Sequence, residues 1–371
     1  ALKKAKELFP KADTYKDYRR MLSSNANKID AVIVSTPDHT HAPASIMAMK
    51  MDKNVYCQKP LTHHVSEART MSQLAEEKNL VTQMGIQVHS FYDYKLATLL
   101  IQSGIIGKVS TVRAWSPKNW GYDGPEPEGE DPIPDNLDWN LWLGTAPDRP
   151  YKDKVYHPFN WRKLVDYGCG TLGDMGVHIL ALDVPLTIKN SCRKPNGFGY
   201  PENNIVTYTF PGTPYTSDTL KWIWHDGADA PKYHKDLKLP KREKLPQQGA
   251  MFVGEKGKLL LPHFMELPRL IVDGEYKEID ITPFEKSKQI GAPIRNYEQE
   301  SPKHYHQFVD ACLDKGTCTA PFSYSAKLTE TILLGVIAGR FPNKTLHWDK
   351  KASKFQETEA NKYLNFEYRD F

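Results

Sequence analysis

The sequence has few cysteines, no long apolar run and no block of like charge, and each absence argues against one class of protein. Its five cysteines lie scattered among 371 residues without a Cys-x-x-Cys pair, so neither a zinc knuckle nor a disulfide framework is expected. No apolar run approaches the roughly 20 residues that cross a bilayer. The net charge of +4 comes from residues spread along the chain, which gives no electrostatic footprint for nucleic acid.

The hydrophobic pattern predicts two domains, and the length is sufficient for two separate cores. Short, unalternating apolar strands at 30–35, 54–57 and 80–84 are separated by helical stretches at 42–51 and 66–78, a pattern typical of a parallel sheet covered on both faces. Later segments alternate with a period of two, as in an antiparallel sheet. These are 204–210, 219–225, 250–253, 258–261, 269–272 and 276–281. We therefore expect a parallel α/β domain over residues 1–90 and an α+β domain over residues 91–371.

Two short motifs carry side chains suited to hydride transfer. The strand Asn54–Cys57 leads to Lys59, in front of Pro60, where a side chain points into the crevice at the strand ends. Further on, Asp174 and His178 stand four residues apart on one predicted helical face. Taken alone, Lys59 fits a surface turn, and the other two fit an exposed helix pair. A lysine, an aspartate and a histidine together are what oxidation of an alcohol requires, so we expect a dehydrogenase.

The strand ends at Ser35, Lys59 and Gln87 should meet at the carboxyl edge of one sheet, the edge where a nucleotide binds. The stretch from Thr36 to His41 follows the first of these strands, where helix capping is the ordinary explanation. The histidines of the region lack carboxylates or cysteines at ligand spacing, so no metal site is expected.

In this order the motifs resemble the glucose–fructose oxidoreductase/inositol dehydrogenase/MocA family. The matching residues are Thr36-Pro37-Asp38-x-x-His41, Gln58-Lys59-Pro60, Trp161-Arg162, and Gly173-Asp174-x-x-x-His178 with Asp183. The phrases Leu141–Pro147 and Phe159–Arg162 are similar to a branch common in bacteria that degrade complex carbohydrates. The resemblance runs from about Asp13 to the C-terminus. It implies a Rossmann-type nucleotide-binding domain followed by a substrate-binding and oligomerisation domain.

The resemblance also implies the cofactor and the site. The cofactor is expected to be NAD or NADP, with NAD favoured. Its expected contacts are Ser35, Thr36, Pro37, His41, Gln58, Lys59, Gln87, Trp161 and Arg162. The expected substrate contacts are Lys59, Tyr156, His157, Arg162, Asp174 and His178. Lys59 is expected to bond the reacting oxygen, His178 to accept its proton, and Asp174 to orient the substrate or the histidine.

Two departures from the family pattern stand out. The family's usual Glu-Lys-Pro is Gln58-Lys59-Pro60 here, which removes a negative charge beside Lys59 but keeps hydrogen-bonding capacity. The opening strand, its Gly-x-Gly-x-x-Gly turn and the acidic residue after the second strand are also absent. The chain begins at Ala1–Phe9 in what reads as an amphipathic helix, so we expect that the native protein has this segment ahead of residue 1.

A ring-shaped carbohydrate is the substrate that we expect. Aromatic residues that suit sugar faces are concentrated in the second domain: Trp115, Trp120, Trp139, Trp142, Tyr151, Tyr156 and Trp161. Any one of them fits a core role equally well. Three functions stay open: a sugar, glycoside or cyclitol dehydrogenase, a redox-assisted glycosidase or lyase, and a non-catalytic carbohydrate-binding or assembly subunit. We expect a homodimer or homotetramer, and the compartment stays open between bacterial cytoplasm and periplasm.

Overall fold

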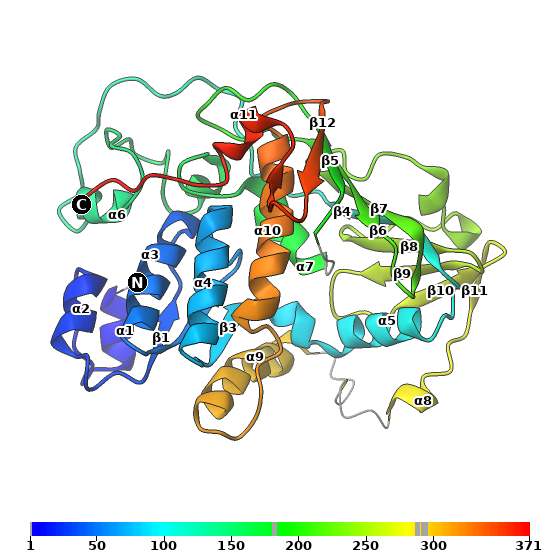
Figure 1. The fold of residues 1–371 in the computed structure, drawn as a ribbon, viewed down its shortest axis with the longest axis horizontal. Helices are drawn as coiled ribbons and strands as arrows, with labels where there is room; N and C mark the ends of the chain where they lie inside the picture. The colour runs from blue at the N-terminus through cyan, green and yellow to red at the C-terminus, as the bar shows by residue number, and fades with distance from the viewer. Residues whose placement is uncertain (1, 180–183, 286–289, 291–295) are drawn as a thin grey trace.

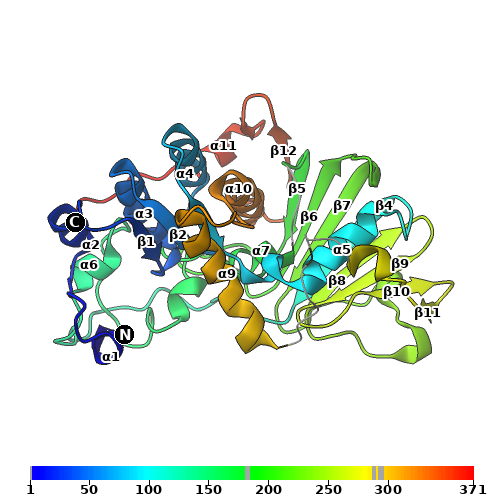
Figure 2. The same ribbon diagram turned by 90° about the horizontal axis from the view of Figure 1, so that it is seen from below.

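The computed structural model describes residues 2–179, 184–285, 290 and 296–371. It contains a small parallel sheet and a large mixed sheet, with helix α10 (Phe322–Ala338) between them (Figures 1 and 2). This arrangement confirms the predicted fold class, a parallel α/β part followed by a part with a large, mainly antiparallel sheet.

The small sheet has the strand order β1-β2-β3, and all its pairs are parallel. Its strands are β1 (Ala31–Val34), β2 (Asn54–Gln58) and β3 (Thr82–Gly85), linked by helices α3 (His41–Lys50) and α4 (Val65–Glu77). The pairing aligns Val34 with Cys57, and Gln58 with Gly85, so the three carboxyl ends lie at one edge. This edge is the one that the sequence predicted.

The later part of the chain covers the outer edge of this sheet. The Gln83 side chain on β3 donates to the carbonyl of His304 on α9 (Tyr297–Cys312) at 2.7 Å and accepts from the amide of Ala320 at 3.0 Å. Helix α10 packs on α4 and β3. The C-terminal segment also returns to this region, where the amide of Ser66 donates to the carbonyl of Leu364.

The large sheet has ten strands in the order β11-β10-β9-β8-β4-β7-β6-β5-β12-β13. The bounds are β4 (Val109–Ser116), β5 (Thr187–Ser191), β6 (Asn204–Pro211), β7 (Thr216–Asp226), β8 (Gly249–Gly254), β9 (Lys258–Pro262), β10 (Arg269–Val272), β11 (Glu275–Lys277), β12 (Thr345–Asp349) and β13 (Lys354–Phe355). All pairs are antiparallel except β4 with β7. The sequence did not predict β5, β12 and β13, and it predicted a longer β11.

The two faces of the large sheet are packed differently. The inner face contributes Val112, Tyr208 and Trp222 to the main core, which it shares with α5 (Tyr92–Gln102) and α10. On the outer face Trp115 and Met251 form a separate apolar cluster with the 3-10 helix at Lys235–Leu237 and its neighbours. The remaining helices are α1 (Leu2–Leu8), α2 (Tyr18–Ser24), α6 (Trp139–Leu143), α7 (Val177–Ile179), α8 (Thr282–Glu285) and α11 (Thr358–Asn361).

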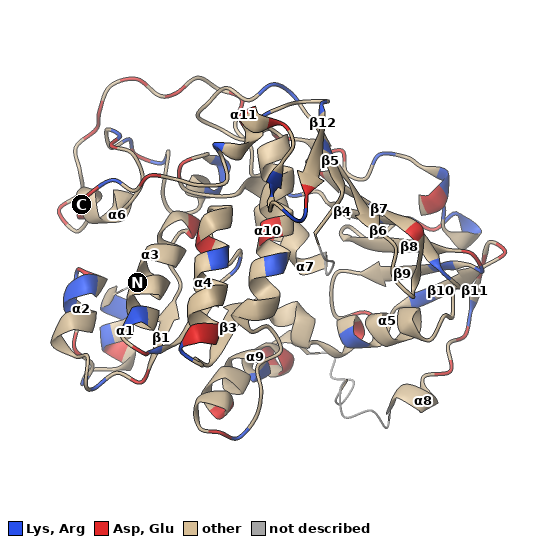
Figure 3. Cartoon of the chain, viewed as in Figure 1, with Lys and Arg blue, Asp and Glu red and all other residues tan. Residues whose placement is uncertain are grey.

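The charged residues are interleaved rather than gathered. Figure 3 shows Lys and Arg alternating with Asp and Glu along both parts of the fold, in agreement with the sequence. Within the described part of the chain, no helix has the length and apolar content that a membrane span requires.

Candidate active site

The loops after the three parallel strands form one edge of the candidate site. Ser35 and Thr36 are exposed at the end of β1, and Gln87 is half-buried after β3. The buried ring of His41 joins two of these loops: its Nδ1 lies 2.8 Å from the carbonyl oxygen of Pro60, and its Nε2 lies 2.9 Å from that of Thr36. The neutral ring has one N–H to donate, so it bonds to one of these carbonyls and lies close against the other, between the loops that a cofactor would touch.

The strand ends fit the nicotinamide half of a dinucleotide. A Cβ added to Gly85 would stand 2.6 Å from Oε1 of Gln58, so the Gln58 side chain occupies space that only glycine leaves free. Gln87 donates to the hydroxyl of Tyr305 at 2.6 Å. These amides, with the exposed Ser35 and Thr36, supply neutral donors and acceptors of the kind that a carboxamide requires.

An ion pair joins the two parts of the fold at this edge. The ammonium nitrogen of Lys59 lies 2.5 Å from Oδ1 of Asp174 and also donates to the backbone carbonyl of Asp174 at 2.7 Å. Both side chains are largely buried, with 16% and 10% of their surface exposed. The lysine and the aspartate that the sequence singled out are therefore in direct contact.

Other positive groups surround the same carboxylate. Nζ of Lys118 lies 3.5 Å from Oδ2, Nε of Arg162 lies 3.7 Å from Oδ1, and the indole N–H of Trp120 donates to Oδ2 at 2.7 Å. Burial alone would raise the pKa of Asp174. The charges of Lys59, Lys118 and Arg162 outweigh burial and hold that pKa well below its usual range, so the carboxylate stays ionised.

Asp174 lies on a widened helical turn. Leu172–Gly176 is a π-helical turn that runs into α7, and such turns are frequent at functional sites.

The residues from Gly168 to Gly173 have the spacing Gly-x-Gly-x-x-Gly of a dinucleotide-binding turn, but they follow a 3-10 turn instead of a strand. A Cβ on Gly173 would stand only 2.2 Å from the Cβ of Cys169, so this glycine serves close packing.

His178 lies one turn after Asp174 and is 9% exposed. Its Nδ1 is buried without a hydrogen-bond partner in the described structure. Burial, and next the charge of Lys59, lowers the pKa of His178 well below its ordinary value. The ring is thus neutral at neutral pH.

Arg162 lies over aromatic rings. Its guanidinium carbon lies 4.2 Å from the ring centre of Trp161 and 5.6 Å from that of Trp120. The same guanidinium approaches Asp174, with Nε 3.7 Å from Oδ1. Asp38, after β1, is buried in the same field: burial raises its pKa to about 7, against the lowering effect of Arg162 and Lys59.

Two further residues were expected to contact substrate, Tyr156 and His157. The ring of Tyr156 is 3% exposed within an aromatic cluster, and its hydroxyl donates to the carbonyl of Pro150 at 3.1 Å. The structure therefore places Tyr156 in a packing role. The same cluster holds Trp139, Trp142, Tyr151, Trp161 and Tyr167. His157 is exposed on the segment that follows Tyr156. Asp183, part of the motif, lies outside the described residues.

The sequence did not single out two residues that the fold brings to the site, Lys118 and His263. Lys118 lies two residues beyond β4, and His263 follows β9 directly. The ring centre of His263 lies 5.3 Å from that of His178. Polar residues immediately after strands were the available signal, but nothing in the sequence says that these two strand ends face Lys59.

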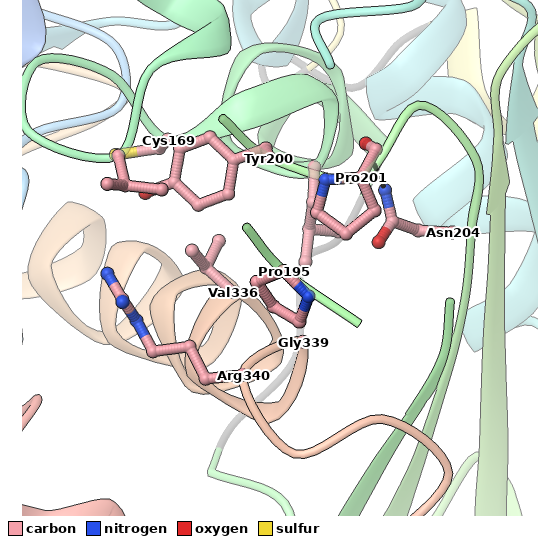
Figure 4. A pocket seen from close by; sticks show the side chains of 10 residues that line it. Cys169, Pro195, Tyr200, Pro201, Asn204, Val336, Gly339 and Arg340 are labelled. Atoms are coloured by element: carbon pink, nitrogen blue, oxygen red, sulfur yellow. Dashed lines mark hydrogen bonds between the residues drawn. The ribbon is translucent and has the colours of Figure 1, made fainter. Parts of the chain in front are cut away.

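The cavities of the fold support this location only indirectly. Figure 4 shows a cavity near the end of α10, lined by Tyr200, Val336 and Arg340, whose volume of about 30 Å³ suits a single water molecule. A larger cavity of about 690 Å³ lies between α5 and the inner face of the large sheet, and its lining is mainly apolar. His89 and Tyr94 line this cavity and also bond to the carbonyl of His178 and to His263, so it adjoins the site from behind. Among the described residues, no cluster of His, Cys, Asp or Glu is arranged to hold a metal ion.

Comparisons with known proteins identify the family. The family model described as "Oxidoreductase family, NAD-binding Rossmann fold" matches residues 2–86. A second model, "Oxidoreductase family, C-terminal alpha/beta domain", matches residues 92–188. Both are models of the family that the motifs resemble, and the first agrees with the expected NAD cofactor.

Two similar proteins are named as dehydrogenases of ring-shaped polyols. Levoglucosan dehydrogenase from Pseudarthrobacter phenanthrenivorans is 25% identical over 152 residues, which are 41% of this chain and 31% of that protein. Myo-inositol 2-dehydrogenase from Thermotoga maritima is 23% identical over 197 residues, 49% of this chain and 53% of that protein. The chain thus spans about a third to a half of the length of these curated relatives.

The fold has solved counterparts. The structure of an inositol dehydrogenase homolog with NAD+ from Azotobacter vinelandii has a TM-score of 0.62 and 15% identity, over 90% of this chain and 83% of that one. At this identity the likeness concerns the fold alone. Because the models of both domains match, the chain belongs to the glucose–fructose oxidoreductase/inositol dehydrogenase/MocA family of oxidoreductases.

Proposed function

We propose that this protein is an NAD-dependent oxidoreductase that moves a hydride to or from a ring hydroxyl carbon of a sugar, glycoside or cyclitol. The observation that carries the proposal is the contact of Lys59 with Asp174, whose charges act on the neutral ring of His178 one turn further on. A cation and a neutral base next to each other suit an alcohol that loses a proton as its carbon loses a hydride. The names of the relatives support the substrate class.

Each residue has a defined part in this proposal. His178 accepts the hydroxyl proton, and the Lys59 ammonium stabilises the negative charge that develops on the oxygen. Asp174 holds Lys59 in place through two contacts, at 2.5 and 2.7 Å, and Arg162 is held by Trp161 to contact cofactor or substrate. NAD, when bound along the strand ends at Ser35–Pro37, Gln58 and Gln87, supplies the hydride acceptor.

The test is formation of reduced cofactor by the full-length protein. We expect NAD binding, and NADH formation with at least one of levoglucosan, myo-inositol, scyllo-inositol and glucose. Lys59→Met and His178→Gln should each lower kcat by about 10²–10⁴-fold. The matched controls, Lys50→Met and His306→Gln, change exposed residues of the same types and should keep the wild-type rate. NAD binding without any effect of Lys59→Met on turnover would contradict the assigned roles.

The same assay separates the two alternatives. A redox-assisted glycosidase or lyase would cleave a glycoside without net NADH, whereas a non-catalytic subunit would bind carbohydrate and leave the cofactor unchanged.

We also propose a homodimer or homotetramer that pairs through the outer face of the large sheet. There Ile205, Thr207 and Ile223 are half-buried on adjacent strands, and native mass spectrometry tests this proposal.

A further inference from the structure

The site contains a second imidazole in addition to that of His178. His263 follows β9, and its ring centre lies 5.3 Å from that of His178, with the ring planes at 51°. The hydroxyl of Tyr94, on α5, lies 2.5 Å from Nδ1 of His263. Two histidines from distant parts of the chain therefore face the region that Lys59 and Lys118 also reach.

The Tyr94 contact determines which nitrogen of His263 carries its proton. Burial, followed by the charges of Lys118, Lys59 and His89, lowers the pKa of His263 to about 4, so the neutral ring has one N–H. Burial raises the pKa of Tyr94, so the phenol keeps its proton, and His263 Nδ1 is the acceptor that the described structure offers it. Since Nδ1 accepts, the hydrogen of the ring sits on Nε2, which points away from Tyr94.

The two rings are thus complementary. His178 has no partner at its buried Nδ1, and in the proposed function its neutral ring accepts a proton at the other nitrogen, Nε2. His263 carries its N–H on Nε2, in a ring whose centre lies 5.3 Å from that of His178. Oxygens on neighbouring carbons of a sugar ring stand roughly one hydrogen-bond length apart, about 2.8–3 Å, so rings whose centres are 5.3 Å apart suit two such oxygens.

We propose that His263, held by Tyr94, is a specificity-determining residue that donates its Nε2–H to the oxygen on the carbon next to the one oxidised. This inference rests on the proposed function and narrows its substrates to rings with two oxygens on adjacent carbons. A substrate that lacks the second oxygen leaves the Nε2–H of His263 unpaired in a half-buried site. A site built to hydrogen-bond an oxygen discriminates strongly against the analogue without that oxygen.

The experiment compares a ring polyol that the full-length protein oxidises with its analogue deoxygenated at the neighbouring carbon. In the wild type we expect kcat/KM for the deoxy analogue to be lower by about 10–100-fold, mainly through KM. His263→Phe keeps a ring but removes the donor, and should reduce this difference to about twofold. His263→Gln places an amide N–H near the position of Nε2 and should restore part of it.

A full deoxy penalty in His263→Phe would overturn the proposal. If that variant does not fold, Tyr94→Phe takes its place: loss of the phenol frees the tautomer, and the penalty should fall by about three- to tenfold, whereas an unchanged penalty overturns the proposal. Nitrogen-15 NMR of the wild type should show the Nε2–H tautomer of His263, and the Nδ1–H tautomer would contradict the assignment.

Failure of the proposed function is distinguishable from failure of this inference. If no probe is oxidised, ligand-observed NMR measures binding of myo-inositol and its deoxy analogue without turnover. A preference for the parent compound that is lost in His263→Phe supports the inference even then. Equal binding of both compounds to wild type and variant refutes it.

Discussion

The charge of Asp174 offers the sharpest test of how the site is held together. Asp174→Asn keeps the size of the side chain but removes the negative charge that faces Lys59 at 2.5 Å, Lys118 at 3.5 Å and Arg162 at 3.7 Å. Three cations would then share a site whose main counter-ion is gone. Lys59→Met is the reciprocal change, and it leaves the carboxylate with Lys118, Arg162 and the indole N–H of Trp120.

These remaining partners predict an asymmetry between the two variants. Loss of one partner of a buried pair costs about 3–5 kcal/mol, and Asp174→Asn should fall near the lower end because Lys118 and Arg162 are 45% and 27% exposed and gain hydration. Lys59→Met should cost about 1–2 kcal/mol, since the carboxylate keeps three partners. The double variant should cost less than the sum of the two, because the residues are in contact.

Urea unfolding of the wild type and of the three variants at neutral pH measures these differences. The matched control Lys50→Met, on an exposed position, should unfold with the wild type. A larger loss in Lys59→Met than in Asp174→Asn would refute the reasoning. So would losses below about 0.5 kcal/mol in both, the range of ordinary surface substitutions.

Three further predictions concern protonation, thiols and the C-terminal segment. Stability should fall as the pH drops from about 6.5 to 5, because the unfolded chain takes up protons there that buried histidines with lowered pKa do not. The histidines are His39, His41, His63, His64, His89, His178, His225, His263 and His304. Three carboxyls with pKa raised to about 7 (Asp38, Glu67 and Asp226) oppose this, since their folded forms keep protons that the unfolded chain releases above about pH 4. Because these carboxyls are fewer than the histidines, the histidines should determine the direction of the change. A urea midpoint that stays level or rises on acidification would contradict this expectation. Cys57 and Cys169 are buried thiols with raised pKa and should resist a thiol reagent until unfolding, whereas rapid native labelling of either would disagree. Arg369→Ala removes donors to the carbonyls of Ala146 and Gly144, so amide exchange at 139–146 should quicken, and unchanged exchange would argue against this anchor.

Local pattern predicted the elements that meet at the strand ends. The apolar strands at 30–35 and 54–57 and the helices after them lie within a residue or two of β1, β2, α3 and α4. Lys59 and Asp174 were assigned to one site by family resemblance, and they are in contact. Their separation of 115 residues shows why periodicity alone could not have joined them.

The remaining residues depend on long-range packing. Strand β12 pairs with β5 across more than 150 residues. Each has only five residues, so the alternation within them is too short to predict which strand pairs with which. Tyr156 is an aromatic residue of the kind that binds sugars, but the side chains packed around it bury it. His263 reaches His178 only because β9 and α7 end on the same side of the fold, which no local spacing encodes.

Transfer of deuterium from substrate to NAD shows directly whether this protein moves a hydride from a ring carbon. The full-length protein is incubated with NAD and a panel of ring polyols deuterated at their carbinol carbons, and the cofactor is analysed by mass spectrometry. We expect one deuterium to reach the cofactor from at least one polyol, Lys59→Met to slow this transfer by about 10²–10⁴-fold, and Lys50→Met to preserve it. Polyol binding without deuterium in the cofactor, or full transfer in Lys59→Met, would contradict these expectations.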